Sequence, residues 1–320
     1  MLNSGGIVLN NTDNTFFRRL KNEYLGKGIV TIFGFSIILL TLIITVFLIY
    51  KGTGTFLISK HSIFEFLFSN IFSPQDIAGA TERGQVGSAV FIFGSILIST
   101  IAMLIATPFA IASAIFVNEI SPSIGKKILQ PAIEIFVGIP SVVYGWIGLS
   151  ILVPFIASVF NLPYGFSVLA GAIVLSIMIF PTITIVSIDA IRNVPIEYKA
   201  AAYSLGSTRW QMIRKVQLRS AIPGILTGVV LGLARAFGEA LAVAMVIGRR
   251  EYFPKFNKGF FEGILSATSN LTSKIASDMG NTVTGSEWNN VLWSMALLLF
   301  IISFLFILLI RLFNRNIKRN

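Results

Sequence analysis

The chain has 320 residues, of which 54% are hydrophobic and 12% are charged, and its mean hydropathy is +0.81. That much apolar surface exceeds what a water-soluble core of this length can bury, so the composition excludes an ordinary soluble protein and predicts an integral membrane protein. The net charge of +11 comes from basic residues that flank apolar blocks, which favours orientation in the membrane over binding to nucleic acid.

The sequence also carries no pattern for a cofactor or a metal ion. It has no Cys and a single His, so neither a disulfide framework nor a His or Cys metal cluster is expected, and His61 is expected to be a solvated loop residue. The phosphate-cradling pattern G-x-x-x-x-G-K-[ST] is missing, so any ATP that drives this protein binds to another polypeptide.

The first apolar run follows a polar stretch, 1–28, that we expect to be a cytoplasmic tail. Residues 29–50 are uncharged and long enough to cross a bilayer, and their late start favours a retained helix over a cleaved signal peptide. A second span is expected over 86–117, where Pro108 predicts a tilt or a kink.

No charged residue occurs between Ile135 and Ile188, a length that requires two helices. The turn sequence NLPYG at 161–165 divides it, so spans are expected over 130–158 and 165–190. The first of these contains VGIPSVVYG, for which two interpretations stay open. Its small residues only loosen helix packing, or a break there frees backbone N–H groups that line an anion path together with the Ser141 hydroxyl.

The next segment, 193–221, is basic and is expected to face water. It holds a small-residue helical run, a Gly at position 206 able to turn the chain, and a second helical run, which predicts two short helices in the membrane interface. Three successive Ala residues let the groove of another protein approach closely, so docking is expected. The alternative is an ordinary basic loop held near anionic lipid headgroups.

The fifth span, about 222–247, is apolar except for Arg235 and Glu239. These residues are four apart, so we expect them one above the other on one helix face, near mid-membrane, where a charge costs roughly 2.5–3.5 kcal/mol. One interpretation is a structural ion pair, although buried pairs often fail to offset their desolvation. The preferred interpretation is a substrate path in which Arg235 binds the oxygens of an anion with its planar fork and Glu239 holds that fork when substrate is absent.

The sixth span is expected over 288–310, and a basic tail, 313–320, ends the chain. Lys and Arg are concentrated on the side that holds both termini and the segment 193–221, so the positive-inside rule places these parts in the cytoplasm. The expected fold is therefore all-α, with six transmembrane helices in one membrane domain, 29–312, surrounded by membrane lipid.

Three stretches resemble a known family. KAAAYSLGSTRWQMIRKVQL, 199–218, resembles the cytoplasmic EAA loop of permease subunits of ATP-binding-cassette importers, except that Ala200 replaces the Glu of that motif and Arg219 replaces its Pro. LARAFGEALAVAMVIG, 233–248, and EIFVGIPSVVYG, 134–145, resemble the phosphate-specific permeases, and the PstC type more than the PstA type.

This resemblance implies the type I (MetI-like) permease architecture in the cytoplasmic (inner) membrane. It implies a transport subunit that is not an enzyme, with a PstA-like second permease, a PstB-like cytoplasmic ATPase dimer and a PstS-like external phosphate-binding protein as partners. It also implies that the segment 193–221 is the coupling loop to the ATPase. Glu197 lies three residues before Ala200, on roughly the same helix face, so we expect it to substitute in part for the missing Glu. The residues expected to couple are Glu197, Ala200, Ala201, Ala202, Ser204, Leu205 and Gly206.

Two alternatives stay open for the function. The closer one is a permease of the same architecture for another oxyanion, such as molybdate or sulfate. The more distant one is an ion-coupled transporter or channel that works alone, in which Arg235 and Glu239 act as a relay. The EAA-like loop is the sequence feature against this second alternative.

Overall fold

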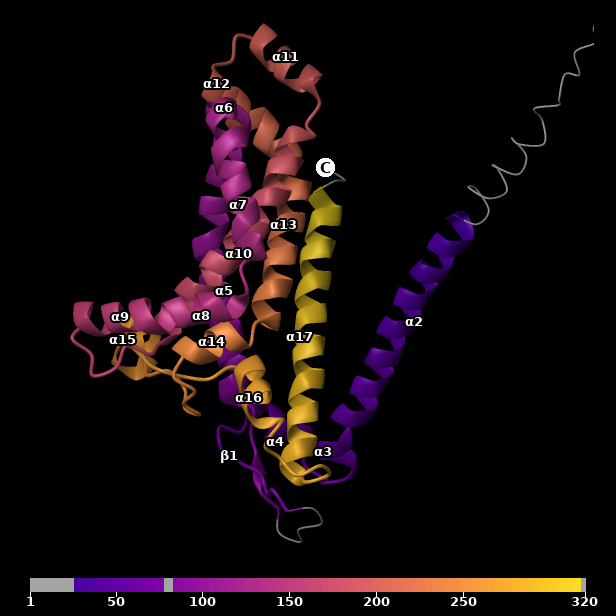
Figure 1. Cartoon of the computed structure of the whole chain (residues 1–320), viewed down its shortest axis with the longest axis vertical. Coiled ribbons are helices and arrows are strands. Elements are labelled where there is room, and N and C mark those ends of the chain that lie inside the picture. Colours follow the sequence, from indigo (N-terminus) through magenta and orange to yellow (C-terminus); the bar gives the residue numbers. More distant parts are fainter. Residues whose placement is uncertain (1–25, 78–82, 318–320) are drawn as a thin grey trace, which may run out of the picture. The chain divides into compact units, whose positions relative to one another are not determined.

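The computed structural model describes residues 26–77 and 83–317 (Figure 1). Most of the tail expected over 1–28, and the last three residues of the tail expected over 313–320, lie outside these described residues. The chain divides into two compact units, Met1–Lys51 and Gly52–Asn320, and each is described by itself.

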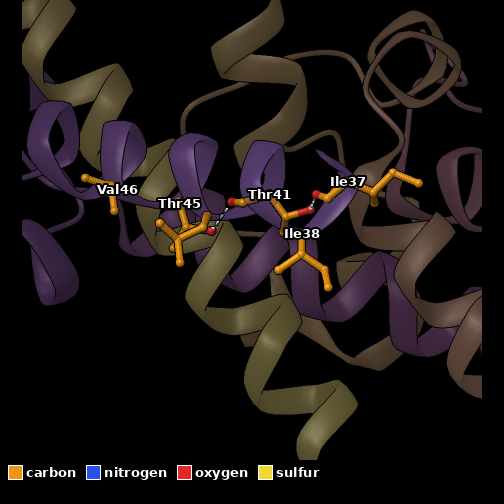
Figure 2. Close-up of a pocket in the computed structure, with 6 residues that line it drawn as sticks. Ile37, Ile38, Thr41, Thr45 and Val46 are labelled. Carbon is orange, nitrogen blue, oxygen red and sulfur yellow. Dashed lines mark hydrogen bonds between the residues drawn. The ribbon is translucent and has the colours of Figure 1, made fainter. Parts of the chain in front are cut away.

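In the first unit, the described residues belong to one helix, α2 (Gly26–Gly52), whose apolar side chains are exposed along its length. Its hydroxyl groups are satisfied within the helix, because Thr41 donates to the carbonyl of Ile37 at 2.8 Å and Thr45 to that of Thr41 at 2.8 Å (Figure 2). A helix with an apolar surface and internally bonded polar groups suits a lipid environment.

The second unit begins with short elements that pack near the start of the last helix. These are α3 (Gly54–Leu57), α4 (Ile63–Phe68) and a two-stranded antiparallel sheet of β1 (Phe72–Ser73) and β2 (Gln85–Val86). Phe66, Val86 and Phe91 are buried there against Leu271 and Leu292. This cluster joins the two strands to helices α5 (Ala89–Ile115), α16 (Leu271–Asp278) and α17 (Glu287–Ile317).

Long helices form the centre of the second unit. They are α5 (Ala89–Ile115), α10 (Val168–Arg192), α13 (Leu218–Gly238) and α17 (Glu287–Ile317). α10 lies between α5 and α13, and the close approach on both sides depends on small residues. Ala102, Ala106 and Ala110 are buried at four-residue spacing on α5, and a Cβ added to Gly232 on α13 would lie 2.6 Å from Ile183 of α10.

Shorter segments connect the long helices. After α5 come η2 (Phe116–Ile120), α6 (Pro122–Ile124), η3 (Gly125–Leu129), α7 (Gln130–Gly138), α8 (Ser141–Ile147), η4 (Gly148–Leu152) and α9 (Val153–Val159). After α10 come α11 (Ile196–Ser204), α12 (Arg209–Gln211) and η5 (Met212–Gln217). After α13 come α14 (Leu241–Val246), η6 (Phe256–Lys258), α15 (Phe260–Leu265) and α16 (Leu271–Asp278).

Six helical stretches among the described residues are long and apolar enough to cross a membrane, which confirms the expected all-α architecture with six transmembrane helices. Their ranges are Gly26–Leu57, Ala89–Ile120, Ser141–Val159, Val168–Arg192, Arg209–Gly238 and Glu287–Leu312. Within the second unit, α11 and α12 lie at one end of α13, and β1 lies beyond its other end (Figure 1).

Two of the expected spans, 130–158 and 222–247, are interrupted in the structure. Between α7 and α8 the chain is extended at Ile139 and Pro140, and α8 and α9 run across the direction of α13 (Figure 1). The range 222–247 contains a second break, because α13 ends at Gly238 and α14 begins at Leu241.

Candidate functional site

The two helix breaks lie at the same place in the second unit. α8, which follows the first break, packs on α14, which follows the second. Gly145 makes this contact possible, because a Cβ there would lie 2.8 Å from the Cα of Ala242. The motifs at 134–145 and 233–248, far apart in sequence, are therefore brought together.

The second break leaves backbone groups without helical partners, and polar side chains of α16 bind them. The carbonyl of Glu239 accepts a hydrogen bond from the Thr272 hydroxyl at 2.9 Å, and that of Ala240 accepts one from Ser273 at 3.3 Å. The Glu239 carboxylate accepts from the backbone N–H of Ala242 at 3.1 Å, so it caps the start of α14. Non-helical backbone at membrane depth needs such partners within the protein.

This geometry corrects the expected pairing of Arg235 with Glu239. Glu239 lies outside α13 with extended backbone (φ −79°, ψ 119°), so the two side chains do not stack on one helix face. Among the described residues no ion pair joins them, and Arg235 Nη1 donates instead to the Thr182 hydroxyl of α10 at 3.1 Å. The expectation that Glu239 holds the Arg235 fork is therefore wrong for this conformation, and Thr182 does so.

Arg235 keeps the chemistry of an anion site. It is half-buried in the last turn of α13, and one of its five N–H donors reaches Thr182. Its position three residues before α13 ends at Gly238 places it beside the second break. Among the described residues its other N–H donors have no hydrogen-bond partner, so they are left for a ligand. At the first break, the Tyr144 hydroxyl of α8 donates to the carbonyl of Phe136 at 2.8 Å.

The surroundings of the breaks are open. A Cβ added to Gly138 or to Gly238 would meet no atom within 4 Å, so each glycine borders free space. Ser141 is the first residue of α8, half-exposed and one turn before Tyr144, and its hydroxyl has no hydrogen-bond partner in the part of the chain that the structure describes. The structure does not bring Ser141 into hydrogen-bond contact with Arg235.

The segment 193–221 forms the expected helix, turn and helix. Gly206 follows α11 with a φ of +74°, in the left-handed region that favours glycine. The amide of Ser207 donates to the carbonyl of Ala202 at 3.2 Å and that of Gly206 to Tyr203 at 2.9 Å, which is the Schellman arrangement for ending a helix. Thr208 then starts α12 with a capping box to Gln211.

The expected coupling residues of this segment divide between surface and core. Ala202 is only 7% exposed and packs in a cluster with Ile191, Met212 and Ile213, whereas Leu205 is 88% exposed. The remaining members are all exposed: Glu197, Ala200, Ala201, Ser204 and Gly206. Ala202 therefore anchors α11, and the other residues are available to a partner.

A carboxylate that the sequence analysis did not single out fixes this segment to the end of the second span. Glu119 Oε1 lies 2.5 Å from Nζ of Lys199 on α11 and accepts from Nε2 of Gln217 at 2.6 Å. The side chains of Glu119 and Lys199 are 11% and 26% exposed, and Gln217 is buried. The position of Glu119 at the end of an uncharged run could have drawn attention to it in the sequence. Its partners could not be predicted, because they are 80 and 98 residues away.

At the other end of the second unit, the expectation of a solvated His61 is wrong. His61 is 7% exposed, and its ring nitrogens lie 3.2 Å from Glu65 and 2.6 Å from Glu287. The same Glu287 carboxylate accepts from the backbone N–H groups of Gln75 and Gly84 at 2.8 and 2.9 Å. Glu287 lies 226 residues from His61, so the local sequence gave no sign of the contact.

Comparisons with known proteins agree with this arrangement. Residues 106–319 match the family model described as "Binding-protein-dependent transport system inner membrane component". The chain is similar to the probable ABC transporter permease protein YqgH of Bacillus subtilis (strain 168), with 49% identity over 293 residues that cover 92% of this chain and 91% of the relative.

Two further similarities concern a named substrate and the fold. The phosphate transport system permease protein PstC of Mesorhizobium japonicum is 33% identical over 267 residues, covering 78% of this chain and 77% of the relative. A chain in an inward-facing structure of the MetNI methionine ABC transporter is similar with a TM-score of 0.50 and 19% identity, covering 70% of this chain and 91% of that chain. The latter similarity concerns the fold alone.

Proposed function

Because the chain belongs to the family of binding-protein-dependent transport system inner membrane components, we propose that it forms the path through which an ATP-driven importer moves inorganic phosphate. Family membership confirms the coarser expectations stated from the sequence. The chain is an ABC importer permease with the MetI-like fold, a multi-pass inner membrane protein and a transport component that is not an enzyme.

The observation that carries phosphate as substrate is the half-buried guanidinium of Arg235 beside the helix break at Glu239. An anion in the membrane interior faces a large desolvation cost, which a cation with free N–H donors offsets. The planar fork of Arg matches phosphate oxygens in a bidentate manner. One Arg neutralises phosphate only partly, so we propose that a PstA-like second permease supplies another cation opposite it.

Support for phosphate over another oxyanion comes from the relatives, since Arg binds the oxygens of sulfate or molybdate by the same geometry. The PstC protein of Mesorhizobium japonicum carries phosphate transport in its name. Glu239 contributes by capping α14 and so fixing the break, rather than by pairing with Arg235. Ser141 contributes a free hydroxyl near the other break.

The partners follow from the exposed residues of α11. We propose that α11 and the turn at Gly206 dock on a PstB-like ATPase dimer in the cytoplasm, and that a PstS-like external protein delivers phosphate to the opposite side. Leu205, which is 88% exposed, presents an apolar side chain that a partner groove can bury. In this topology both termini are cytoplasmic.

Reconstituted vesicles that contain the permease with its ATPase and second permease test the proposal. Phosphate should stimulate ATP hydrolysis and should be taken up, and sulfate or molybdate should compete weakly. Arg235→Gln should reduce uptake at least tenfold at unchanged abundance, since a charge-assisted hydrogen bond contributes roughly 1.5–3 kcal/mol. Arg311→Gln, at an exposed arginine of α17 outside the segment 193–221, serves as the matched control and should retain uptake.

Three results would contradict the proposal. Molybdate or sulfate uptake that exceeds phosphate uptake would assign another oxyanion to the same architecture. Substrate flux without any ATPase partner would favour a transporter that works alone. Uptake that recovers in the double variant Arg235→Met, Glu239→Leu would show that the two charges serve packing only.

A further inference from the structure

A pocket of about 670 Å³ lies outside the proposed phosphate path, between the turn after α9 and the chain that follows α14. Leu162, Pro163 and Tyr164 form one wall, and Arg250, Tyr252 and Lys255 lie in the other. Nothing in the proposed function uses this pocket.

The charge of the pocket favours an anion. Arg250 and Lys255 are exposed, and within the described residues neither has an ion-pair partner. Glu262 is the acidic residue in the lining, so the three charges sum to a positive value at neutral pH. Two unpaired cations at one cavity are suited to a phosphate group.

The size and the apolar lining favour an amphiphile over a free ion. A volume of 670 Å³ falls within the range of organic ligand sites, which is roughly 300–1,000 Å³. Phe166, Phe253 and Leu265 contribute apolar surface beside the cations. Inorganic phosphate is too small to use that surface, whereas a phospholipid fills the cavity with its headgroup and the start of its acyl chains.

The exposed aromatic side chains at the pocket fit a lipid headgroup. Tyr164 and Tyr252 are 70% and 75% exposed, and such tyrosines are typical of the membrane–water interface. On the neighbouring α15, Phe260 and Phe261 are also exposed, at 64% and 76%, and suit contact with lipid.

We propose that this pocket binds the phosphate group of an anionic phospholipid through Arg250 and Lys255. The proposed topology places this lipid in the outer leaflet, whereas the binding itself does not depend on phosphate transport. The bound lipid stabilises the loop between α14 and α16, because Arg250 and Lys255 both belong to it.

The experiment compares lipids retained by the purified full-length protein. The protein is exchanged from vesicles of phosphatidylcholine and phosphatidylglycerol into mild detergent, and bound lipids are counted by native mass spectrometry. The wild type should retain phosphatidylglycerol preferentially, and the double variant Arg250→Gln, Lys255→Gln should lose that preference by roughly tenfold or more. The double variant Lys60→Gln, Arg83→Gln removes two exposed basic residues elsewhere and should behave as the wild type.

The outcomes distinguish a phospholipid headgroup from free inorganic phosphate as the ligand of this pocket. Equal retention by the wild type and the Arg250, Lys255 variant, at equal thermal stability, would overturn the proposal. Displacement of phosphatidylglycerol by excess inorganic phosphate, or binding of inorganic phosphate alone, would show that the pocket serves a free ion and that the lipid assignment is wrong. Loss of the preference in both double variants would show a general charge effect and would also overturn it.

Discussion

At the residue scale, the hydrogen bond from Arg235 to Thr182 decides where the guanidinium points. An Arg side chain has many rotamers, and a fixed acceptor reduces the entropy lost when substrate binds. Thr182 follows Pro181, which is buried inside α10, so its position is set by a rigid part of the core. Thr182 is therefore a positioning residue for Arg235.

Replacing Thr182 by Val should lower phosphate uptake about tenfold, because the guanidinium loses its acceptor while the side-chain volume stays nearly the same. Thr182→Ser keeps the hydroxyl and should retain most uptake. The measurement is the concentration dependence of uptake, which should show a raised half-saturation constant for Val and not for Ser. Equal half-saturation constants for the Val and Ser variants would show that Thr182 does not position Arg235.

Gly206 permits a prediction about backbone strain alone. Its φ is +74°, and a Cβ built there meets no atom within 4 Å, so a substitution changes conformational energy without a steric clash. Gly206→Val should cost roughly 1–2 kcal/mol in the left-handed region and distort the turn after α11, whereas Asn should be tolerated better. Phosphate-stimulated ATPase activity should fall for Val at normal membrane abundance. Loss of Val-variant protein through misinsertion would contradict this prediction.

At the element scale, the two helix breaks show what the sequence could predict. Pro140 lies inside the expected span 130–158 and has no backbone N–H, so that break had a local cause and was foreseen as one of two interpretations. The break at Glu239 has no Pro, and its free carbonyls are bound by Thr272 and Ser273 of α16, 33 residues later. Hydropathy predicts the length of a span, but a break that depends on distant partners leaves no local pattern.

The contacts of Glu119 with the segment 193–221 also depend on residues that are distant in sequence. Glu119, in η2, accepts from Gln217 of η5 and pairs with Lys199 of α11, and so joins the end of the second span to the segment 193–221. Glu119→Gln should leave Lys199 with an unpaired, largely buried charge, which costs roughly 1–3 kcal/mol. We expect a lower thermal stability and a weaker response of ATP hydrolysis to phosphate. Glu134→Gln is the control, because the Glu134 carboxylate is exposed. Equal thermal stability and equal ATPase response in the two variants would show that Glu119 does not hold the segment 193–221 in place.

At the scale of the whole molecule, the small-residue contacts of α10 with α5 and α13 explain why a fold with few charges holds together. Lipid tails are as apolar as the helix surfaces, so the hydrophobic effect does not bring helices together in the membrane. Close van der Waals packing stabilises their association instead. The all-α class and the six spans were predictable because hydropathy reports them directly. The direction of α8 and α9 across α13 was not, because it depends on contacts between distant segments.

Topology supplies the remaining prediction. The positive-inside distribution places α11 in the cytoplasm and the chain before α17 outside, and the structure lets the two probe positions be chosen for exposure. Thr284 and Asn193 are both exposed, and the protein has no Cys, so a single Cys at either position reports without background. An impermeant thiol reagent added to intact cells should label Thr284→Cys directly, and Asn193→Cys only after the membrane is permeabilised. Reversed labelling would place α11 outside, where no ATP-hydrolysing partner can reach it, and would overturn the coupling surface together with the direction of transport.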